Sequence, residues 1–488
     1  MGRVRFGTSL LLIMICLAAT AQKKKVGLLR IEPIPEEKVA ESAPAAGVAD
    51  SGSVTIQHIR VQGNHKTKTP IILRELGIYP GEKLRADSIT TILDEARQRL
   101  VNTSLFLTVR VYLSGLRGRQ SDLRVDVTER WYTFPIPVFS LADRNFNVWW
   151  VEEHHRLDRI NFGVNVYQYN LTGRNDRLAL SVQQGYTHRY AITYQLPYFD
   201  RKLRQGLGVN IIYSQNRELN YQTSLNKQQY FKQDQFLKKE FSAGIFYTYK
   251  KAIRLYHQLS LSYNFQSVAD TILRLNPRYF PDDHTTQRYL ELSYRFNYNG
   301  ADQWAYPLEG TTISAQLTRR GFGLLGNINE TQLYMKASRY WTLFPKTYLV
   351  GGLRGEWITP ERQPYFLLRG MGYYEDYLRG LEYYVADADR YGILKTELKR
   401  EMLAFQVRSS LLPHKFSVVP VRIYAKIFSD LGYAHSLLPG NELLNNKLLY
   451  TYGAGLDFVT FYDIHVRVEY SFNQLGEKGL FLHTKAEF

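Results

Sequence analysis

The feature that most constrains this chain is an alternation of apolar and polar side chains that recurs from about Asp158 to Phe488. Segments of roughly ten residues, separated by polar turns, repeat this alternation and are typical of the strands of a membrane β-barrel. In one of them Ile313, Ala315 and Leu317 alternate with polar residues. The same pattern recurs at 178–183, 394–402, 463–472 and 480–488. We expect about 16 antiparallel strands, because each strand with its turn needs roughly twenty residues.

Composition separates a membrane barrel from a soluble β-sandwich with wet outer faces. The chain has 37 Tyr and 25 Phe in 488 residues, and 14% of its residues are aromatic. Aromatic girdles at the two membrane interfaces use many such residues, whereas a sandwich rarely reaches this length. The mean hydropathy is −0.32, a value that alternating strands give on average. Beyond the N-terminal region there is no run of about 18 apolar residues that would predict a transmembrane helix.

The N-terminus has the layout of a secretory signal. A short basic region precedes the apolar run Leu10–Leu17, and small residues follow it, which predicts a cleaved signal peptide at 1–21. The only cysteine, Cys16, lies inside this peptide, so we expect a mature chain without disulfides or cysteine-ligated metals. Residues 22–52 are rich in Lys, then in Pro, Glu, Ala and Ser, and are predicted to be a flexible linker. Export of this kind indicates a bacterial envelope protein.

The formal net charge of +17 first suggests a nucleic-acid-binding protein. However, no basic block accompanies a recognition helix, and Lys and Arg are spread along the alternating strands. We therefore expect no nucleic-acid partner, and we assign the charge to lumen-facing residues and to loops near anionic lipid headgroups.

Residues 53–130 are predicted to form a small α+β module with the order β-α-α-β-β. Its helices have clear start and stop signals, and the second has one apolar stripe. The expected elements are a strand at 54–61, a helix that Thr69 caps and Gly77 ends, a helix from about Asp87 to Leu100, and strands at 106–113 and 123–127.

The edge of such a small sheet offers unpaired backbone groups to which an extended partner can add a strand. A spacer without a ligand is the alternative. Residues 131–157 are expected to connect the module to the barrel, which we place at 158–488. The pair His154–His155 lies in this connector and is expected to be solvated rather than to bind a metal.

Two stretches of the barrel region stand out as a candidate site. The first contains Leu378, Arg379 and Gly380 in a loop. The second is a strand in which Phe428 and Asp430 lie on the face opposite to an apolar one, so that both would look into the lumen. Asp430 is therefore a candidate partner for an arginine on a loop that folds inward. Glu397 falls on the lumen face of the preceding strand and is a second acidic candidate.

Several motifs occur in one order along the chain. They are Val61-Gln62-Gly63-Asn64 at the start of the module, Leu171-Thr172-Gly173-Arg174-Asn175-Asp176-Arg177-Leu178, Leu196-Pro197-Tyr198-Phe199, Tyr306-Pro307-Leu308-Glu309-Gly310, Leu378-Arg379-Gly380-Leu381, and Phe428-Ser429-Asp430-Leu431-Gly432. Together they resemble the BamA/TamA/TpsB-type outer-membrane proteins of the bacterial surface antigen superfamily, with a single POTRA domain at 53–130. The terminal Phe488 resembles the C-terminal barrel signal of such proteins, although Ala486 and His483 stand at its other positions.

The resemblance implies roles for these motifs. The segment at 171–178 is similar to the first barrel hairpin of the family, and the Tyr-Pro-x-x-Gly segment to a turn midway through the barrel. The Arg-Gly motif marks the tip of a long loop that folds into the barrel, where Arg379 would meet Asp430. Gly432 belongs to the partner motif. Leu381 stands where the family usually has an aromatic residue, so the packing of the loop tip is left open.

The function that the resemblance implies is that of an insertase or translocase in the outer membrane. A periplasmic POTRA domain would receive an unfolded outer-membrane or secreted client, with periplasmic accessory proteins as further partners, and the barrel would insert or conduct it. The alternatives are a passive porin, a structural barrel and an outer-membrane hydrolase. Neither Gly-x-Ser-x-Gly nor His-Glu-x-x-His occurs, and no Gly-Lys-Ser/Thr phosphate loop is present, so we expect no enzyme, cofactor or metal.

Overall fold

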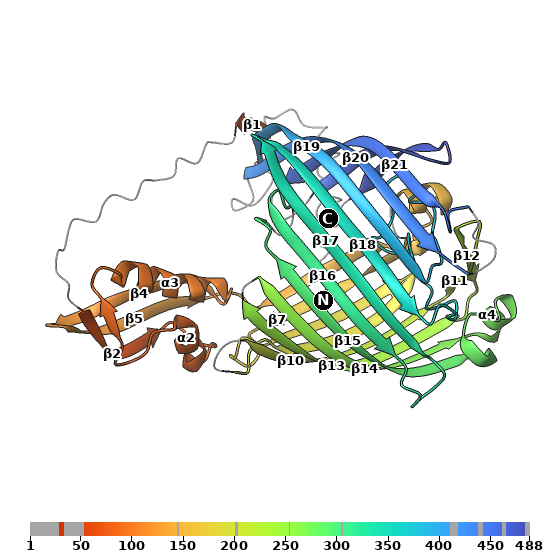
Figure 1. Cartoon of the computed structure of the whole chain (residues 1–488). Helices are drawn as coiled ribbons and strands as arrows, with labels where there is room; N and C mark the ends of the chain where they lie inside the picture. The colour runs from red at the N-terminus through yellow and green to blue at the C-terminus, as the bar shows by residue number, and fades with distance from the viewer. Residues whose placement is uncertain are drawn as a thin grey trace.

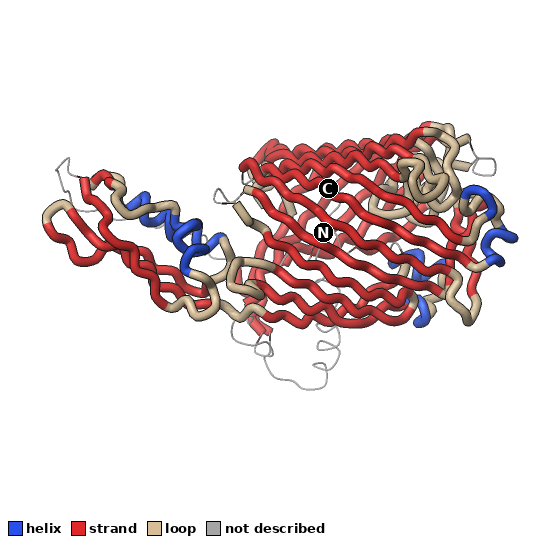
Figure 2. Tube along the Cα trace, turned by 90° about the horizontal axis from the view of Figure 1, so that it is seen from below, coloured by secondary structure: helices blue, strands red, loops and turns tan. Residues whose placement is uncertain are grey.

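The computed structural model describes residues 29–33, 53–143, 146–200, 204–252, 254–303, 306–409, 418–437, 443–460 and 465–483. A small module lies at one end of a large cylinder of slanted strands, and short helices and a hairpin lie at the other end (Figure 1). Figure 2 shows that the cylinder is almost entirely strand. Within the described residues, no helix is both long and apolar enough to cross a membrane.

The module confirms the predicted β-α-α-β-β order and adds one short strand between the helices. Its sheet has the order β3-β2-β5-β4, in which β2 and β5 are parallel. The apolar stripe of α3 packs on this sheet, and Ala96 and Leu100 are fully buried. The elements are β2 (Ser53–Gln62), α2 (Thr69–Leu76), β3 (Lys83–Arg85), α3 (Ile89–Asn102), β4 (Phe106–Arg117) and β5 (Gln120–Glu129).

Of the two predicted ends of α2, the C-terminal one is confirmed and the N-terminal one is wrong. Gly77 ends the helix with φ at 68°, a left-handed conformation that glycine adopts without steric cost. Thr69 does not cap the helix, however, because it is the first helical residue and follows Lys68. Its hydroxyl instead accepts a hydrogen bond from Asn64 Nδ2 at 3.1 Å.

Sixteen strands form the barrel in the part of the chain that the structure describes, which confirms the predicted fold class. Each strand pairs antiparallel with the next along the chain, and the sheet order places the last strand beside the first. They are β6 (Thr133–Leu141), β7 (Ile160–Tyr169), β8 (Arg177–Gly185), β9 (Thr187–Leu196), β10 (Gln205–Asn216), β13 (Lys238–Ala252), β14 (Leu255–Val268), β15 (Thr286–Asn299), β16 (Gly310–Arg320), β17 (Glu330–Phe344), β18 (Thr347–Thr359), β19 (Arg390–Ser409), β20 (Val418–His435), β21 (Leu448–Thr460), β22 (His465–Asn473) and β23 (Lys478–His483).

The barrel begins earlier than the expected residue 158. β6 pairs with β7 from Thr133↔Gln168 to Leu141↔Ile160, so part of the expected connector is a barrel strand. Pro135 and Pro137 interrupt the alternation there and hide the strand from the sequence pattern. A proline is tolerated in a sheet where its missing N–H faces away from the ladder, and these two lie on the same edge of β6.

Two further expectations need correction. The turn at 170–176 joins β7 to β8, so it is the second hairpin of the barrel rather than the first, because β6 precedes it. Within the expected linker 22–52, β1 (Leu29–Pro33) pairs antiparallel with the end of β19, from Leu29↔Ser409 to Pro33↔Phe405. An unpaired strand edge readily accepts an extended segment. The rest of the linker, the signal peptide and Phe488 lie outside the described residues.

The alternation separates an apolar outer surface from a polar interior. Outward residues such as Ile211, Ile245, Leu353 and Ile427 are 49–60% exposed, as a lipid-facing surface requires. On β20 the neighbours of Ile427 face inward and are buried, as predicted. The end of the barrel opposite to the module carries η1 (Val148–Glu152), η2 (Leu157–Arg159), β11 (Glu218–Ser224), β12 (Lys227–Lys232), α4 (Asp270–Leu275) and η3 (Pro281–Asp283).

The module docks on turns at one end of the barrel through a few polar contacts. The Lys68 backbone N–H donates to the Gly173 carbonyl at 3.0 Å, and Asn170 Nδ2 donates to Thr67 Oγ1 at 2.8 Å. The Arg74 guanidinium lies over the Tyr198 ring at 5.7 Å. The two motifs at 171–178 and 196–199 therefore form the surface on which the module rests.

Candidate functional site

The candidate site is built around the segment 360–389, which joins β18 to β19 and is called here the inward loop. Most of its residues from Tyr365 to Asp389 are buried, although the segment contains no strand. Leu378 and Leu381 are 1% and 2% exposed and pack with Ile393 and Ala434 on the barrel wall. The leucine that replaces the usual aromatic at 381 thus fills an aliphatic cluster.

Arg379 lies at the tip of the inward loop and is fully buried. Its Nε donates to Asp430 Oδ2 at 2.9 Å and its Nη2 to Asp430 Oδ1 at 2.5 Å. Its Nη1 donates to Glu397 Oε2 at 2.8 Å. The two predicted acidic partners therefore hold the guanidinium together, with a two-pronged contact to Asp430 that a planar fork provides and a lysine does not.

The backbone around Arg379 is fixed as firmly as its side chain. Its N–H donates to Asp430 Oδ2 at 3.0 Å. The next N–H, of Gly380, donates to Glu382 Oε2 at 2.6 Å, and the Gly380 carbonyl accepts from Asn473 Nδ2 at 2.7 Å. Gly380 has φ at 93°, and a Cβ there would lie 3.0 Å from Ser471 Cβ, so glycine suits this tip on both counts.

The partner motif on β20 contributes a ring and a gap besides its carboxylate. The Arg379 guanidinium lies 3.9 Å from the centroid of the Phe428 ring, a cation–π contact in a desolvated site. Gly432 leaves room for the loop, because a Cβ there would meet Leu378 Cδ1 at 2.7 Å. β20 therefore presents to the loop tip the aromatic ring of Phe428, the carboxylate of Asp430 and the space that Gly432 leaves.

Buried charges extend the site along the inner wall. Lys426 Nζ lies 2.6 Å from both Asp457 Oδ1 and Glu469 Oε1, and Lys399 Nζ lies 3.3 Å from Glu397 Oε1. A charge in such a place is tolerated only when opposite charges and hydrogen bonds surround it. We call this group the lumen cluster: Arg379, Lys395, Glu397, Lys399, Lys426, Asp430, Asp457, Arg467, Glu469 and His483.

A second motif reaches the lumen cluster from the other end of the barrel. Tyr306, in the turn between β15 and β16, is 6% exposed, and its hydroxyl donates to Asp457 Oδ2 at 2.7 Å. Its ring lies 5.1 Å from that of Tyr424, and the Lys399 ammonium lies 4.2 Å from its centroid. The Tyr-Pro-x-x-Gly turn is thereby joined to the wall that holds Arg379.

Sequence reasoning placed Leu378, Arg379, Gly380, Glu397, Phe428, Asp430 and Gly432, and the structure brings all seven together. It did not single out Glu469 or Lys426 as members of the site. Both lie on the inward faces that the alternation had identified, so the signal was present. Alternation does not give the position of each residue along the barrel axis, because that position depends on strand register. Phe488 lies beyond the described end of β23.

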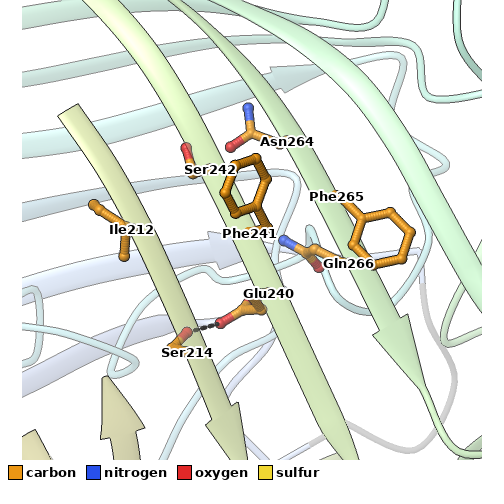
Figure 3. Close-up of a pocket in the computed structure, with 8 residues that line it drawn as sticks. All are labelled: Ile212, Ser214, Glu240, Phe241, Ser242, Asn264, Phe265 and Gln266. Carbon is orange, nitrogen blue, oxygen red and sulfur yellow. Dashed lines mark hydrogen bonds between the residues drawn. The ribbon is translucent and has the colours of Figure 1, made fainter. Parts of the chain in front are cut away.

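A recess of about 180 Å³ lies elsewhere on the inner wall, over β10, β13 and β14. Ser214 and Glu240 point toward each other across neighbouring strands there (Figure 3), and Ser214 Oγ donates to Glu240 Oε2 at 3.2 Å. The other lining residues are Ile212, Phe241, Ser242, Asn264, Phe265 and Gln266. Glu240 is the one charged residue that lines the recess, and no residue of the inward loop is among the lining residues.

In the part of the chain that the structure describes, no group of three or more His, Cys, Asp and Glu residues is arranged to hold a metal ion. The carboxylates of the lumen cluster each lie beside a lysine, arginine or histidine instead. The arrangement can hold a loop in the lumen and release it when water or another chain offers replacement partners.

Comparisons with known proteins agree with this architecture. A family model described as the Omp85 superfamily domain matches residues 170–375, and the POTRA model, described as a surface antigen variable number repeat, matches residues 54–130. No protein of curated description matches the sequence.

Two solved structures place the fold. The crystal structure of BamA from Haemophilus ducreyi lacking POTRA domains 1–3 is similar with a TM-score of 0.62 at 15% identity, over 99% of this chain and 93% of that chain. CdiB from Escherichia coli is similar with a TM-score of 0.50 at 13% identity, over 88% of this chain and 75% of that chain.

Proposed function

Because the chain belongs to the Omp85 superfamily, as a BamA/TamA/TpsB-type outer-membrane protein with a POTRA domain, we propose that it receives unfolded polypeptide through that domain. The barrel then inserts the client into the outer membrane or secretes it across. At the level of the family, such proteins act in the insertion and secretion of outer-membrane and secreted proteins. The client and the choice between insertion and secretion belong to the proposal.

The observation that carries the proposal is the buried attachment of the inward loop. Arg379 bonds Asp430 and Glu397 inside the lumen, where it is fully buried. A loop tip held in this way occupies the route that solutes would take through a passive porin. A translocase or insertase needs a closed resting state and a contact that can be exchanged. Buried ion pairs meet both needs, because they are strong when dry and weak once water enters.

The edge strand β4 supports the first step of the proposal. It lies at the end of the sheet order β3-β2-β5-β4 and pairs with β5 alone in the described module. Leu107 and Leu116 on this strand are each 66% exposed, and Tyr112 is 38% exposed. An extended client can add a strand to such an edge, using backbone hydrogen bonds for affinity and these side chains for contact.

We also propose that the protein acts without covalent catalysis, cofactor or metal. The driving force is then the free energy of the client, whose unpaired backbone groups gain partners in the barrel wall. This part of the proposal is supported by the pairing of the buried charges among themselves, because none of the contacts in the lumen cluster resembles a nucleophile with its base.

The test is client folding in liposomes. The purified full-length protein should accelerate the folding of an added unfolded barrel protein, and Arg379→Ala, compared at an equal amount of folded barrel, should abolish this effect. Arg295→Ala is a matched control, because Arg295 lies on the wall and bonds only the neutral Gln316 side chain; it should behave as wild type.

The rival functions give different outcomes in the same assay. Solute conductance with no effect on client folding would favour the passive porin. Hydrolysis of lipid or peptide by the purified protein would favour the outer-membrane hydrolase. Equal client folding by wild type and Arg379→Ala would remove the loop attachment from the mechanism.

A further inference from the structure

The edge of the last barrel strand is occupied by a side chain rather than by a strand at Leu480 and Leu482. Asn147 Nδ2 donates to the Leu480 carbonyl at 2.7 Å, and the Leu482 N–H donates to Asn147 Oδ1 at 3.1 Å. Leu480 and Leu482 are alternate residues, so both groups lie on one edge of β23. β22 pairs along the other edge, with Val468↔Leu482 and Tyr470↔Leu480.

A primary amide suits this place because it offers a donor and an acceptor side by side. It bonds the two backbone groups that flank Phe481, which an antiparallel neighbouring strand would bond through two alternate residues. Asn147 directly precedes η1, a place where an asparagine often caps a helix. Here its side chain makes no cap hydrogen bond to η1 and bonds β23 instead.

The seam is the junction at which the last strand, β23, meets the first strand, β6. Its β6 side is poor in backbone N–H donors. Pro135 and Pro137 of β6 both lack an N–H and lie on one edge of the strand. The β6–β7 ladder runs without interruption past both prolines, so we infer that the missing donors face β23. β23 and β6 are hydrogen-bonded neighbours in the sheet order, and at Leu480 and Leu482 the partner on this edge is the Asn147 side chain.

The loop that carries Asn147 is rigidly attached at its base. Arg159 is 1% exposed and bonds Asp143 and Glu218, each at 2.5 Å. Its guanidinium lies between the rings of Tyr186 and Tyr230, at 4.9 and 4.7 Å from their centroids. Because Asp143 and Arg159 bracket the loop, this buried pair closes it and presents Asn147 to the seam.

The inward loop contacts β23 from inside the barrel. Tyr383 lies four positions after Arg379, and its ring is 5.6 Å from that of Phe481 on β23. The next residue, Tyr384, donates to Glu477 Oε1 at 2.6 Å just before β23. The attachment of Arg379 and the cap on β23 are therefore parts of one connected structure.

We propose that Asn147 is a removable cap on the edge of β23, which keeps the seam closed until the strand of a client replaces it. The proposal rests on the proposed function. The occupant that fits is an extended segment with alternating side chains, because Leu480 is 61% exposed on the lipid side whereas Phe481 is 2% exposed on the inner side. Such a segment bonds the same two groups and several more, so it outcompetes one amide.

The cap is tested first without any client. In lipid nanodiscs, hydrogen–deuterium exchange of the segment 478–483 should be about tenfold faster in Asn147→Ala than in wild type, as expected for the loss of one protecting hydrogen bond. Asn216→Ala is the matched control, because Asn216 Nδ2 also makes two hydrogen bonds, to Tyr186 and Thr187, away from the seam. It should leave this segment unchanged.

The second test adds an unfolded barrel client and a photo-crosslinking residue at position 480. Asn147→Ala should raise the yield of client crosslinked to β23 by about two- to fivefold, since fewer hydrogen bonds must be broken. Asn147→Asp keeps the size but places an acceptor against the Leu480 carbonyl, so it should also raise the yield and guards against misfolding of the alanine variant.

The outcomes separate this proposal from the proposed function. Unchanged exchange of 478–483 in a folded Asn147→Ala barrel overturns the cap whatever the client does. Faster exchange with an unchanged crosslink yield overturns the replacement by a client strand. If wild type fails to accelerate client folding while exchange still depends on Asn147, the proposed function fails and the cap alone stands.

Discussion

The two halves of the barrel wall differ in what covers their inner faces. Along β19–β22 many of the inward residues are charged, buried and bound to one another or to the inward loop. Along β8–β10, β13 and β14 the inward residues are mostly small or neutral, such as Ser181, Ser260, Ser262 and Asn264, and they remain partly exposed. We call the inward residues of β19–β22, together with the inward loop, the block. We call the inward residues of β8–β10, β13 and β14 the open wall.

The difference teaches where such a barrel can change shape. Buried ion pairs specify one arrangement, because moving either partner leaves a charge without solvent. Neutral polar residues beside water exchange partners at little cost. The seam between β23 and β6 lies where the block meets the open wall, so a movement of the loop reaches the seam from the rigid side.

The largest effect is expected from Asp430→Ala in the block. It leaves the buried guanidinium of Arg379 without its two-pronged partner and removes a carboxylate that lies 4.0 Å from Lys395 Nζ. The barrel should lose about 3–5 kcal/mol of stability, the usual cost of breaking a buried pair. The midpoint of the heat-dependent shift in gel mobility measures this. A midpoint equal to that of wild type would show that the block is hydrated and would remove the contrast between the halves.

Tyr306→Phe tests whether the turn between β15 and β16 belongs to the block. The substitution removes the hydrogen bond to Asp457 and keeps the ring against Tyr424. Hydrogen bonds to charged groups contribute about 1.5–3 kcal/mol, and the midpoint should fall by an amount in that range. Asp457 retains Lys426 at 2.6 Å, so the loss should stay below that of Asp430→Ala. A larger loss of stability for Tyr306→Phe than for Asp430→Ala would mean that the turn between β15 and β16 stabilises the block more than the Arg379–Asp430 contact does.

Gly432→Ala tests the fit of the loop rather than its charge. The added Cβ would lie 2.7 Å from Leu378 Cδ1, which is the flexible end of a side chain. Overpacking by one methyl group should therefore cost about 1 kcal/mol, at the low end of such changes. Leu378→Ala in the same chain should remove the clash, so the double variant should lose less than the sum of the single ones. Strict additivity would contradict the contact.

The sequence predicted the block better than the seam, and the reason lies in the kind of information each needs. Alternation assigns Asp430 and Glu397 to the lumen face, and the loop motif supplies Arg379, so the attachment follows from residues that the chain itself marks. The partners Glu469 and Lys426 depend on how β20, β21 and β22 are staggered. Alternation contains no information on that stagger.

The seam is harder still to predict because its residues break the local patterns. Pro135 and Pro137 remove the alternation from β6, so the strand was assigned to a connector. Asn147 precedes a short helical turn, where an asparagine is expected to serve as a cap. Its role at β23 follows only from a contact across 333 positions of the chain, and no local propensity records such a contact.

The smallest effect is expected from Glu240→Gln in the open wall, and it completes the comparison with Asp430. Glu240 accepts from Ser214 at 3.2 Å and lies 2.6 Å from Lys238, yet its side chain remains 34% exposed. An ion pair in contact with water contributes about 0–1 kcal/mol, and glutamine keeps the hydrogen bond to Ser214. The gel-mobility midpoint should therefore stay near that of wild type and respond little to added salt. A loss as large as that of Asp430→Ala would mean that both walls are equally dry, and the seam would then no longer separate a rigid half from a yielding one.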